Sequence, residues 1–362
     1  MSHLTYLEAA VVGLVQGVSE LFPVSSLGHN VLIPAVIGGQ WAADLNVAEA
    51  ESPYLAFVVG LHVATAIALL AYFWRDWVRI TRGFLSSLRD RRVETADQRL
   101  AWMIVLATIP VGLVGLVAEH PFRVIFGKPI AAAVFLAVNG VILIAGERYR
   151  RRESLAADEV VSREAELVTA GGQAARVVSG PGARPGSPGE GPGTPVERPG
   201  SPGEGPGSLG GPARARPRTA VPPEQQAAVA SDRRLSTMGY GRAIVIGSAQ
   251  ILALFAGISR DGVAMVAGMR RGLSREDAAR FAFLLSTPVI LAAGVLKIPE
   301  LFGPLGSGIR GQILLGSILS GVGAYFAVRF LVRYLRTNTL YPFGIYCLVA
   351  GLACVVYLGL IK

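Results

Sequence analysis

The chain has 362 residues, of which 52% are hydrophobic and only 16% are charged. Soluble domains carry about a quarter charged residues, so this composition excludes an ordinary soluble protein. The formal net charge is +9, and the arginines gather in short segments between long apolar runs. This placement follows the positive-inside rule of membrane proteins and argues against nucleic acid as a partner.

The first apolar stretch, 6–37, is interrupted by QGVSELFPVSSLGHN at 16–30. Gln16 and Glu20 lie four residues apart, so they share one face of a helix. Pro23 ends that helix. Two hydroxyls, a glycine and an imidazole follow it closely, at Ser25, Ser26, Gly28 and His29. Because ionisable residues are costly inside a bilayer, the interruption is expected to be a functional site.

Six further apolar runs are long enough to be predicted as spanning helices. They cover 54–74, 100–118, 130–146, 281–298, 311–332 and 341–361. Basic residues concentrate in 75–99, in 269–280, directly after 146 and near 333, which places these segments in the cytoplasm. The rule is satisfied only if 6–37 and a second interrupted stretch, 241–268, each return to the side from which they start. Both chain ends are then expected outside.

The segment 153–235 differs in composition from the rest of the chain. It repeats RPGSPGEGPG at 184–193 and at 198–207. Such a tract buries too little apolar surface to offset its ordering entropy, so the sequence predicts a disordered cytoplasmic linker. It separates a first membrane domain, 1–152, from a second, 236–362.

The two halves resemble each other around their interrupted stretches. Aligning 13–28 with 247–262 pairs Gly13 with Gly247, Gln16 with Gln250, Ser25 with Ser259 and Gly28 with Gly262. Three spanning helices follow each stretch, and an odd number inverts the second half relative to the first. The predicted fold is therefore an all-α polytopic membrane protein, an inverted-topology repeat whose two broken, re-entrant elements meet near the midplane.

The second interruption places Ser259, Arg260 and Asp261 between Gly257 and Gly262. Glycine-containing turns present successive N–H groups to anions, and an arginine grips phosphate through two hydrogen bonds. Adjacent residues rarely form a good ion pair, so the partner of Arg260 is expected outside this segment. Together with the carboxylate, amide, hydroxyls and imidazole of the first interruption, this set predicts phosphoryl transfer on a lipid-borne phosphate.

These residues resemble the motifs of the undecaprenyl-diphosphate phosphatases of the bacitracin-resistance type. The first motif, (E/Q)-x-x-x-E followed by P-V-S-S-x-G-H, is matched by Gln16 to Glu20 and by Pro23 to His29. The second, P-G-x-S-R-S-x-x-T, is matched at Gly257, Ser259 and Arg260. It departs at Ala256, Asp261 and Ala264, which replace the proline, the second serine and the threonine. The resemblance covers both halves.

The resemblance implies an integral membrane hydrolase that converts undecaprenyl diphosphate to undecaprenyl phosphate. Such an enzyme recycles the lipid carrier for cell-wall (peptidoglycan) synthesis and confers bacitracin resistance. It implies the catalytic residues Glu20, His29, Ser26 and Arg260, with the nucleophile left open between Ser26, His29 and water. The substrate-binding candidates are Gln16, Ser25, Gly257, Ser259 and Gly262.

The resemblance also implies a divalent cation, Mg²⁺ or Ca²⁺. Glu20 is a candidate ligand, and so is Asp261, whose negative charge beside a diphosphate would otherwise repel the substrate. The expected location is the plasma membrane, with the site facing outward. The expected partners are a polyprenyl diphosphate lipid and the bilayer, and a homodimer is a further expectation. The alternative function is a flippase or transporter of the phosphorylated lipid, because inverted repeats also build transporters. No catalytic role is expected for His62, Thr65 or Glu147.

Overall fold

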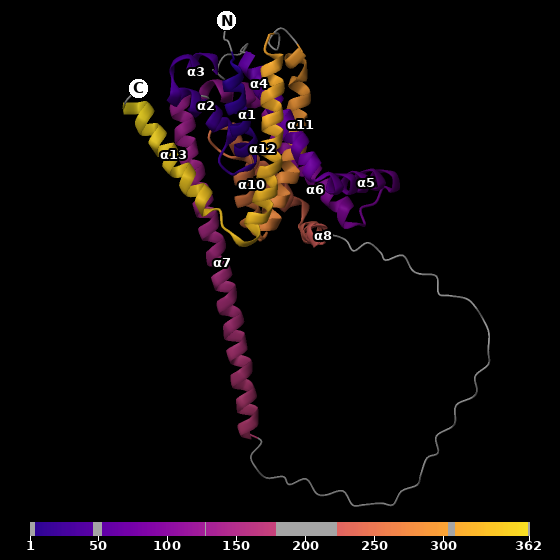
Figure 1. Ribbon diagram of the computed structural model, residues 1–362. Coiled ribbons are helices and arrows are strands. Elements are labelled where there is room, and N and C mark those ends of the chain that lie inside the picture. Colours follow the sequence, from indigo (N-terminus) through magenta and orange to yellow (C-terminus); the bar gives the residue numbers. More distant parts are fainter. Residues whose placement is uncertain (1–3, 46–52, 127, 179–222, 303–307, 361–362) are drawn as a thin grey trace, which may run out of the picture. The chain divides into compact units, whose positions relative to one another are not determined.

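A computed structural model describes residues 4–45, 53–126, 128–178, 223–302 and 308–360. These residues form helices and no strands, so the predicted all-α class is confirmed (Figure 1). The helices are α1 (Tyr6–Leu21), α2 (Ser26–Ile37), α3 (Gly39–Asp44), α4 (Pro53–Tyr72), α5 (Trp74–Asp90), α6 (Ala96–Phe126), α7 (Pro129–Val178), α8 (Pro223–Ser236), α9 (Tyr240–Ala249), the 3₁₀ helix η1 (Gln250–Leu254), α10 (Arg260–Met269), α11 (Arg275–Phe302), α12 (Arg310–Thr337) and α13 (Tyr341–Leu360).

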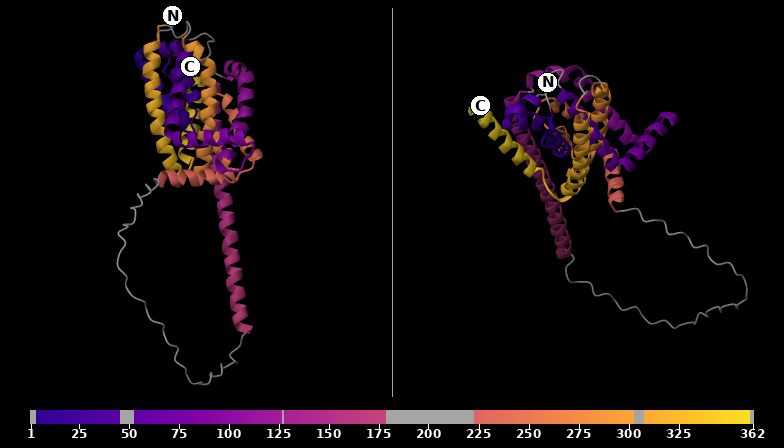
Figure 2. Two further views of the ribbon diagram at one scale, coloured as in Figure 1. Left: turned by 90° about the vertical axis from the view of Figure 1, so that its right-hand side faces the viewer. Right: turned by 45° about the horizontal axis from the view of Figure 1, so that its top comes forward.

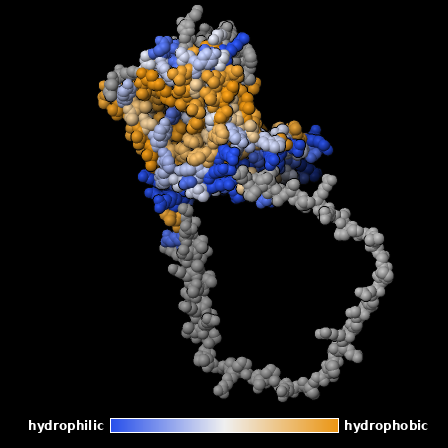
Figure 3. All heavy atoms as spheres, in the orientation of Figure 1, coloured by the Kyte–Doolittle hydropathy of each residue, from blue (hydrophilic) through white to orange (hydrophobic). Residues whose placement is uncertain are grey.

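All six predicted spanning runs are helical. Within the described residues, α6, α7, α11, α12 and α13 each contain a segment long and apolar enough to cross a membrane. A sixth candidate is the pair formed by α4 and α5, which bends by 84° at its break. Hydrophobic side chains cover the middle of the bundle, and hydrophilic ones gather at its ends (Figure 3). The chain is therefore a multi-pass membrane protein.

The chain divides into two compact units, one made of Met1–Glu153 with Gln226–Lys362 and the other of Ser154–Gln225. In the first unit, α1 packs closely on α12. A Cβ atom added at Gly13 would lie 2.5 Å from the carbonyl oxygen of Gly316, so glycine is what lets the two backbones touch. The start of α1 and the end of α13 lie at the same end of this unit (Figure 2).

Two segments contain helices that the sequence analysis does not predict. The basic segment 75–99 contains the helix α5, because its arginines alternate with apolar residues at helical spacing. The predicted linker is helical at both ends, where α7 continues to Val178 and α8 begins at Pro223. Its ends are rich in Ala, Glu and Arg, which favour helix, whereas the Pro/Gly repeat lies in 179–222, outside the described residues.

Both interrupted stretches are broken helices, as predicted. In the first, α1 ends at Leu21, Phe22 is extended, and α2 begins at Ser26. In the second, α9 tightens into η1, Phe255 is extended, and α10 begins at Arg260. Pro23 accounts for the first stop, because proline lacks the N–H that a continuing helix requires. The segments between the helices carry polar residues, among them the N-cap residues Ser25 and Ser259.

Candidate active site

The two breaks touch each other inside the first unit. A Cβ atom added at Gly28 would lie 2.9 Å from the Cα of Gly257. One added at Gly262 would lie 3.2 Å from the Cβ of Pro23. Residues more than 200 positions apart therefore lie in close contact, and at Gly28 the approach is backbone to backbone, so a side chain there would separate the two segments.

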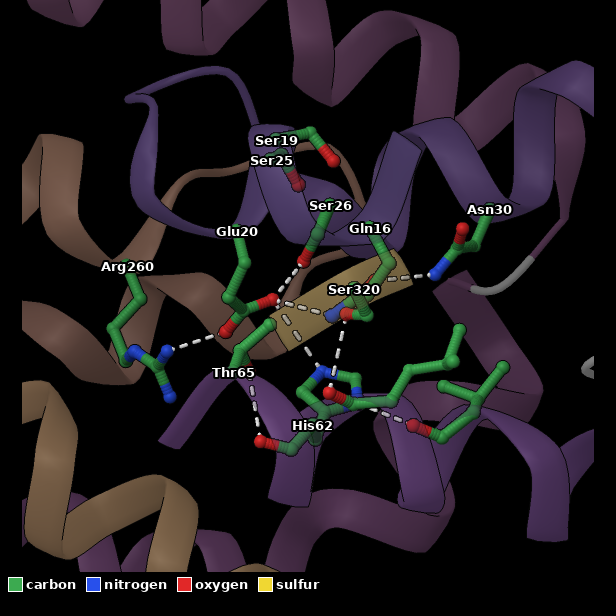
Figure 4. Close-up of polar contacts among 12 residues, drawn as sticks. Gln16, Ser19, Glu20, Ser25, Ser26, Asn30, His62, Thr65, Arg260 and Ser320 are labelled. Atoms are coloured by element: carbon green, nitrogen blue, oxygen red, sulfur yellow. Dashed lines mark hydrogen bonds and ion pairs between the residues drawn. The ribbon is translucent and has the colours of Figure 1, made fainter. Parts of the chain in front are cut away.

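Glu20, in the last turn of α1, is the centre of the polar cluster at this meeting point (Figure 4). Its side chain is buried, and Gln16 donates a hydrogen bond of 2.8 Å to its Oε2. The hydroxyl of Ser26 donates to the same oxygen. The predicted helical face with Gln16 and Glu20 is thus confirmed, and the first residue of α2 is brought onto it.

Arg260, the first residue of α10, supplies the positive charge. Its Nη2 lies 2.6 Å from Oε1 of Glu20, whereas its Nε is 4.0 Å from Oδ1 of the adjacent Asp261. The expected partner outside its own segment is therefore Glu20. The Nε of Arg260 is buried without a hydrogen-bond partner. This free donor can bind a further oxygen, such as one of a phosphate group.

Ser25 and Ser259 occupy equivalent places in the two breaks, as the internal alignment predicts. Each is the N-cap of the following helix: Ser25 Oγ accepts from the N–H of Gly28 at 3.2 Å, and Ser259 Oγ accepts from that of Gly262 at 3.1 Å. The helices α2 and α10 thus both begin at the cluster, and the N-terminal end of a helix favours anions. The backbone of Ser25 has a φ of +67°, which is uncommon for a residue other than glycine.

Two other predicted features of the second break are also located. Gly257 has a φ of +109°, and an added Cβ would lie 2.6 Å from the backbone nitrogen of Leu136 on α7. Gly257 therefore shapes the turn, because no other residue would fit at this position. Ala264 is buried within α10.

His62 on α4 belongs to the cluster, although no catalytic role was expected for it. Its Nε2 lies 3.5 Å from Oε2 of Glu20. Its Nδ1 lies 2.9 Å from the carbonyl oxygen of Val58, to which it must donate, and this bond fixes the ring orientation. In the sequence, His62 is marked only by being an ionisable residue within a predicted spanning run. Thr65 bonds to a backbone carbonyl, that of His62, as predicted.

His29 points elsewhere. Its Nδ1 lies 2.7 Å from the carbonyl oxygen of Ser25, and its Nε2 lies 2.7 Å from the hydroxyl of Tyr346 on α13. A carbonyl oxygen only accepts, so Nδ1 carries the proton and Nε2 accepts from Tyr346. Both nitrogens are occupied in this arrangement, and the catalytic role of His29 stays a prediction.

The polar cluster does not form a prepared cation site. Among the described residues, no group of three or more His, Cys, Asp or Glu side chains is placed to hold a metal ion. Both oxygens of Glu20 already receive donors, including a guanidinium. Asp261 accepts from Ser286 through Oδ1, while its Oδ2 is buried without a hydrogen-bond partner. One free carboxylate oxygen is too little to hold a divalent ion by itself, so a cation at Asp261 would need further oxygen ligands, such as those of a substrate phosphate.

Asn139, within the apolar span of α7, was not predicted from the sequence. Its Nδ2 donates 2.9 Å to the carbonyl oxygen of Pro23, and its Oδ1 accepts 3.0 Å from the N–H of Ser259. One buried amide thus contacts both breaks. A lone asparagine in an apolar run shows neither which backbone groups it will meet nor that they belong to two segments.

The fold and the site together define a multi-pass membrane protein in which two broken helices bring a carboxylate, a hydroxyl and a guanidinium to one buried point. The family model for bacitracin resistance protein BacA matches residues 9–180 and 220–353. The chain belongs to this family.

Curated relatives cover nearly the whole chain. An undecaprenyl-diphosphatase of Mycolicibacterium paratuberculosis is 54% identical over 359 residues, 99% of each chain. An undecaprenyl-diphosphatase 2 of Frankia alni is 54% identical over 361 residues, 98% of each. One from Chromobacterium violaceum is 33% identical over 349 residues, 95% of this chain and 96% of its own.

Proposed function

We propose that this protein hydrolyses undecaprenyl diphosphate to undecaprenyl phosphate and inorganic phosphate, and so recycles a lipid carrier of cell-wall synthesis. The observation that supports this most is the position of Glu20 between the hydroxyl of Ser26 and the guanidinium of Arg260. A base, a nucleophile and a phosphate-binding cation are thereby within contact of one another. The full-length relatives bear the name of this activity.

In the proposed reaction, Ser26 Oγ attacks the terminal phosphorus while Glu20 takes the hydroxyl proton. The bond between that phosphorus and the bridging oxygen breaks, and undecaprenyl phosphate leaves. Water then cleaves the phosphoserine, which releases phosphate and restores Ser26. Arg260 binds the phosphoryl oxygens as charge develops on them, using its free Nε donor. Ser26 is favoured over His29 because both nitrogens of His29 are already bonded.

Purified protein tests the proposal directly. Wild type should release phosphate from a polyprenyl diphosphate, and Glu20→Ala and Arg260→Ala should each lose about 100-fold or more of the turnover, the scale of a lost base or charge stabiliser. If wild type releases no phosphate with a divalent cation present, the proposed hydrolase activity is refuted and lipid transport is favoured. Hydrolysis is favoured over transport because the relatives are named for hydrolysis.

A requirement for Mg²⁺ or Ca²⁺ is part of the proposal. The support for Asp261 as a ligand is its buried Oδ2, which has no hydrogen-bond partner. Phosphate release should be titrated with each cation for wild type and Asp261→Ser. A higher cation concentration at half-maximal rate in the variant supports the role, and identical curves contradict it.

The location is proposed in more detail than membrane insertion alone. Arginine placement supports a plasma-membrane protein with its basic segments in the cytoplasm and the phosphate site opening outward. A homodimer also stays a proposal. Its test is the mass of the protein in detergent or nanodiscs.

A further inference from the structure

The helix α5 carries two parallel stripes on its exposed face. Trp74, Val78, Leu85 and Leu88 form the apolar stripe and are 40–58% exposed. Arg75, Arg82 and Arg89 follow one another at intervals of seven residues and are also exposed, so they form a cationic stripe beside it. The opposite face is buried at Ile80, Gly83 and Ser87. The exposed stripes are therefore not part of the protein core.

The orientation of α5 matches this pattern. The helix turns by 84° from the spanning segment Phe57–Tyr72, so it lies across the direction of the spans, beside α6 (Figure 1). It is fixed there by hydrogen bonds from α6: Trp102 Nε1 donates 3.0 Å to Ser87, and Gln98 donates 3.0 Å to Ser86. A helix held across the direction of the spans has the orientation that an interfacial helix requires.

We propose that α5 is an interfacial helix that binds an anionic bilayer surface. Its apolar stripe enters the boundary between headgroups and acyl chains, while the arginine stripe contacts lipid phosphates. Apolar and basic residues in this arrangement are what an interfacial helix requires, and anionic lipids attract juxtamembrane arginines. The partner is the lipid headgroup layer and not a second protein, because three aligned arginines complement a surface of negative charge.

Depth-dependent fluorescence tests this placement in the full-length protein. An environment-sensitive dye is attached at Leu85→Cys, on the apolar stripe, or at Arg92→Cys, an exposed control beyond the helix. Cys354→Ala removes the partly accessible native thiol, while Cys347 is buried. In vesicles of phosphatidylcholine and phosphatidylglycerol containing brominated lipid, the dye at 85 should lose most of its emission and that at 92 little. Equal, weak quenching at both positions would overturn the proposal.

The arginine stripe has its own test. Arg75→Gln, Arg82→Gln and Arg89→Gln are combined in the protein labelled at Leu85→Cys. With the arginines present, quenching should be stronger in vesicles with phosphatidylglycerol than in phosphatidylcholine alone. Without them, the difference should vanish. A difference that survives the triple substitution would overturn the headgroup contact.

A second inference concerns Asn139 and rests on the proposed hydrolase function. Its amide joins the carbonyl of Pro23 to the N–H of Ser259, and it is fully buried. Pro23 lies between Glu20 and Ser26, whereas Ser259 directly precedes Arg260. The amide therefore fixes the segment bearing the base and hydroxyl against the segment bearing the cation.

We infer that Asn139 is a positioning residue, which sets the distance between Arg260 and the Glu20–Ser26 pair. It satisfies two backbone groups that the breaks leave without helical partners, since neither Pro23 nor Ser259 is inside a helix. Its loss would let the two segments shift relative to each other while each helix stays intact. Shifts of about 1 Å can cost on the order of 100-fold in rate.

The test separates positioning from general stability. Asn139→Leu keeps the side-chain size and removes both bonds, while Thr287→Val removes a buried hydroxyl that bonds only within α11. Asn139→Leu should lower kcat about 10- to 100-fold with little change in KM. This loss should exceed the loss of kcat in Thr287→Val, measured at a temperature where both variants are folded. If kcat falls no further than in Thr287→Val, the inference is wrong. If wild type releases no phosphate, the hydrolase proposal fails instead.

Discussion

Two adjacent serines at the first break have different tasks in this structure. Ser26 donates its hydroxyl to Glu20, whereas Ser25 uses its hydroxyl to cap α2. Sequence alone treats both as polar residues at a break, and only the direction of each side chain separates them.

The serines give a matched pair of substitutions. Ser26→Ala should abolish most phosphate release with little change in thermal unfolding, because it removes a reacting hydroxyl. Ser25→Ala should lower stability by about 1 kcal/mol, the usual cost of a lost N-cap, and retain more activity. Turnover and unfolding temperature of both variants are measured in the same detergent. A lower turnover in Ser25→Ala than in Ser26→Ala would contradict the assignment of Ser26 as the nucleophile.

The residues of the site were predictable where polar side chains interrupt apolar runs. Glu20, Gln16, Ser26 and Arg260 were identified in this way, and the structure brings them together. His62 and Asn139 lie within unbroken spanning helices. There, a single polar residue bonds to its own backbone as readily as to a distant segment, so sequence spacing cannot reveal its partner.

At the scale of the elements, glycines set the closeness of α1 and α12. Gly13 faces the backbone of Gly316, with no room for a Cβ atom. Gly13→Ala should therefore destabilise the protein by about 1–3 kcal/mol through overpacking and lower activity by displacing α1, which bears Glu20. Thermal unfolding and turnover measure both effects.

Gly112→Ala in α6 is the matched control, since nothing lies within 4 Å of an added Cβ there. It should leave stability unchanged or slightly raised, because alanine favours helix. Equal losses for the two variants would show that close backbone packing is not the cause.

A buried ionic network fastens α8 to α5 and α11. Asp232 on α8 pairs with Arg79 on α5, and it accepts from Arg280 on α11 at 2.7 Å. Asp232→Asn would remove one carboxylate from two guanidiniums that both keep Asp76 as a partner, so we expect a loss of about 1–3 kcal/mol in unfolding free energy. Glu94→Gln, in an exposed pair with Arg92 at 3.6 Å, should cost about 1 kcal/mol or less. Similar unfolding temperatures for both variants would contradict the network's importance.

The helices were more predictable than their connections. Long apolar runs fix the spanning helices. The helix α5 was not predicted, because its arginines were used only to orient the chain, although they recur at helical spacing. The part of α7 beyond Glu153 is not an uninterrupted apolar run, and only its helix-favouring composition indicates that the helix continues.

For the whole molecule, the alignment of the two halves correctly paired the N-cap serines of α2 and α10. Orientation in the membrane is a separate prediction that cysteine labelling can check. Arg271→Cys precedes α11 and Arg310→Cys opens α12, so the two exposed positions flank the span at its opposite ends. In intact cells, an impermeant maleimide should label position 310 and should reach 271 only after permeabilisation. The reverse pattern would invert the proposed topology.

The ion pair between Glu20 and Arg260 joins residues 240 positions apart. A ribosome adds about 5–20 residues per second, so roughly 12 to 48 s pass between the synthesis of the two partners. During that interval the nascent first half contains an acidic group without its guanidinium, and its break has nothing to close against. Until then, the partners that Glu20 has in the first half are Gln16, Ser26 and His62, and the site is completed only when the second half supplies Arg260.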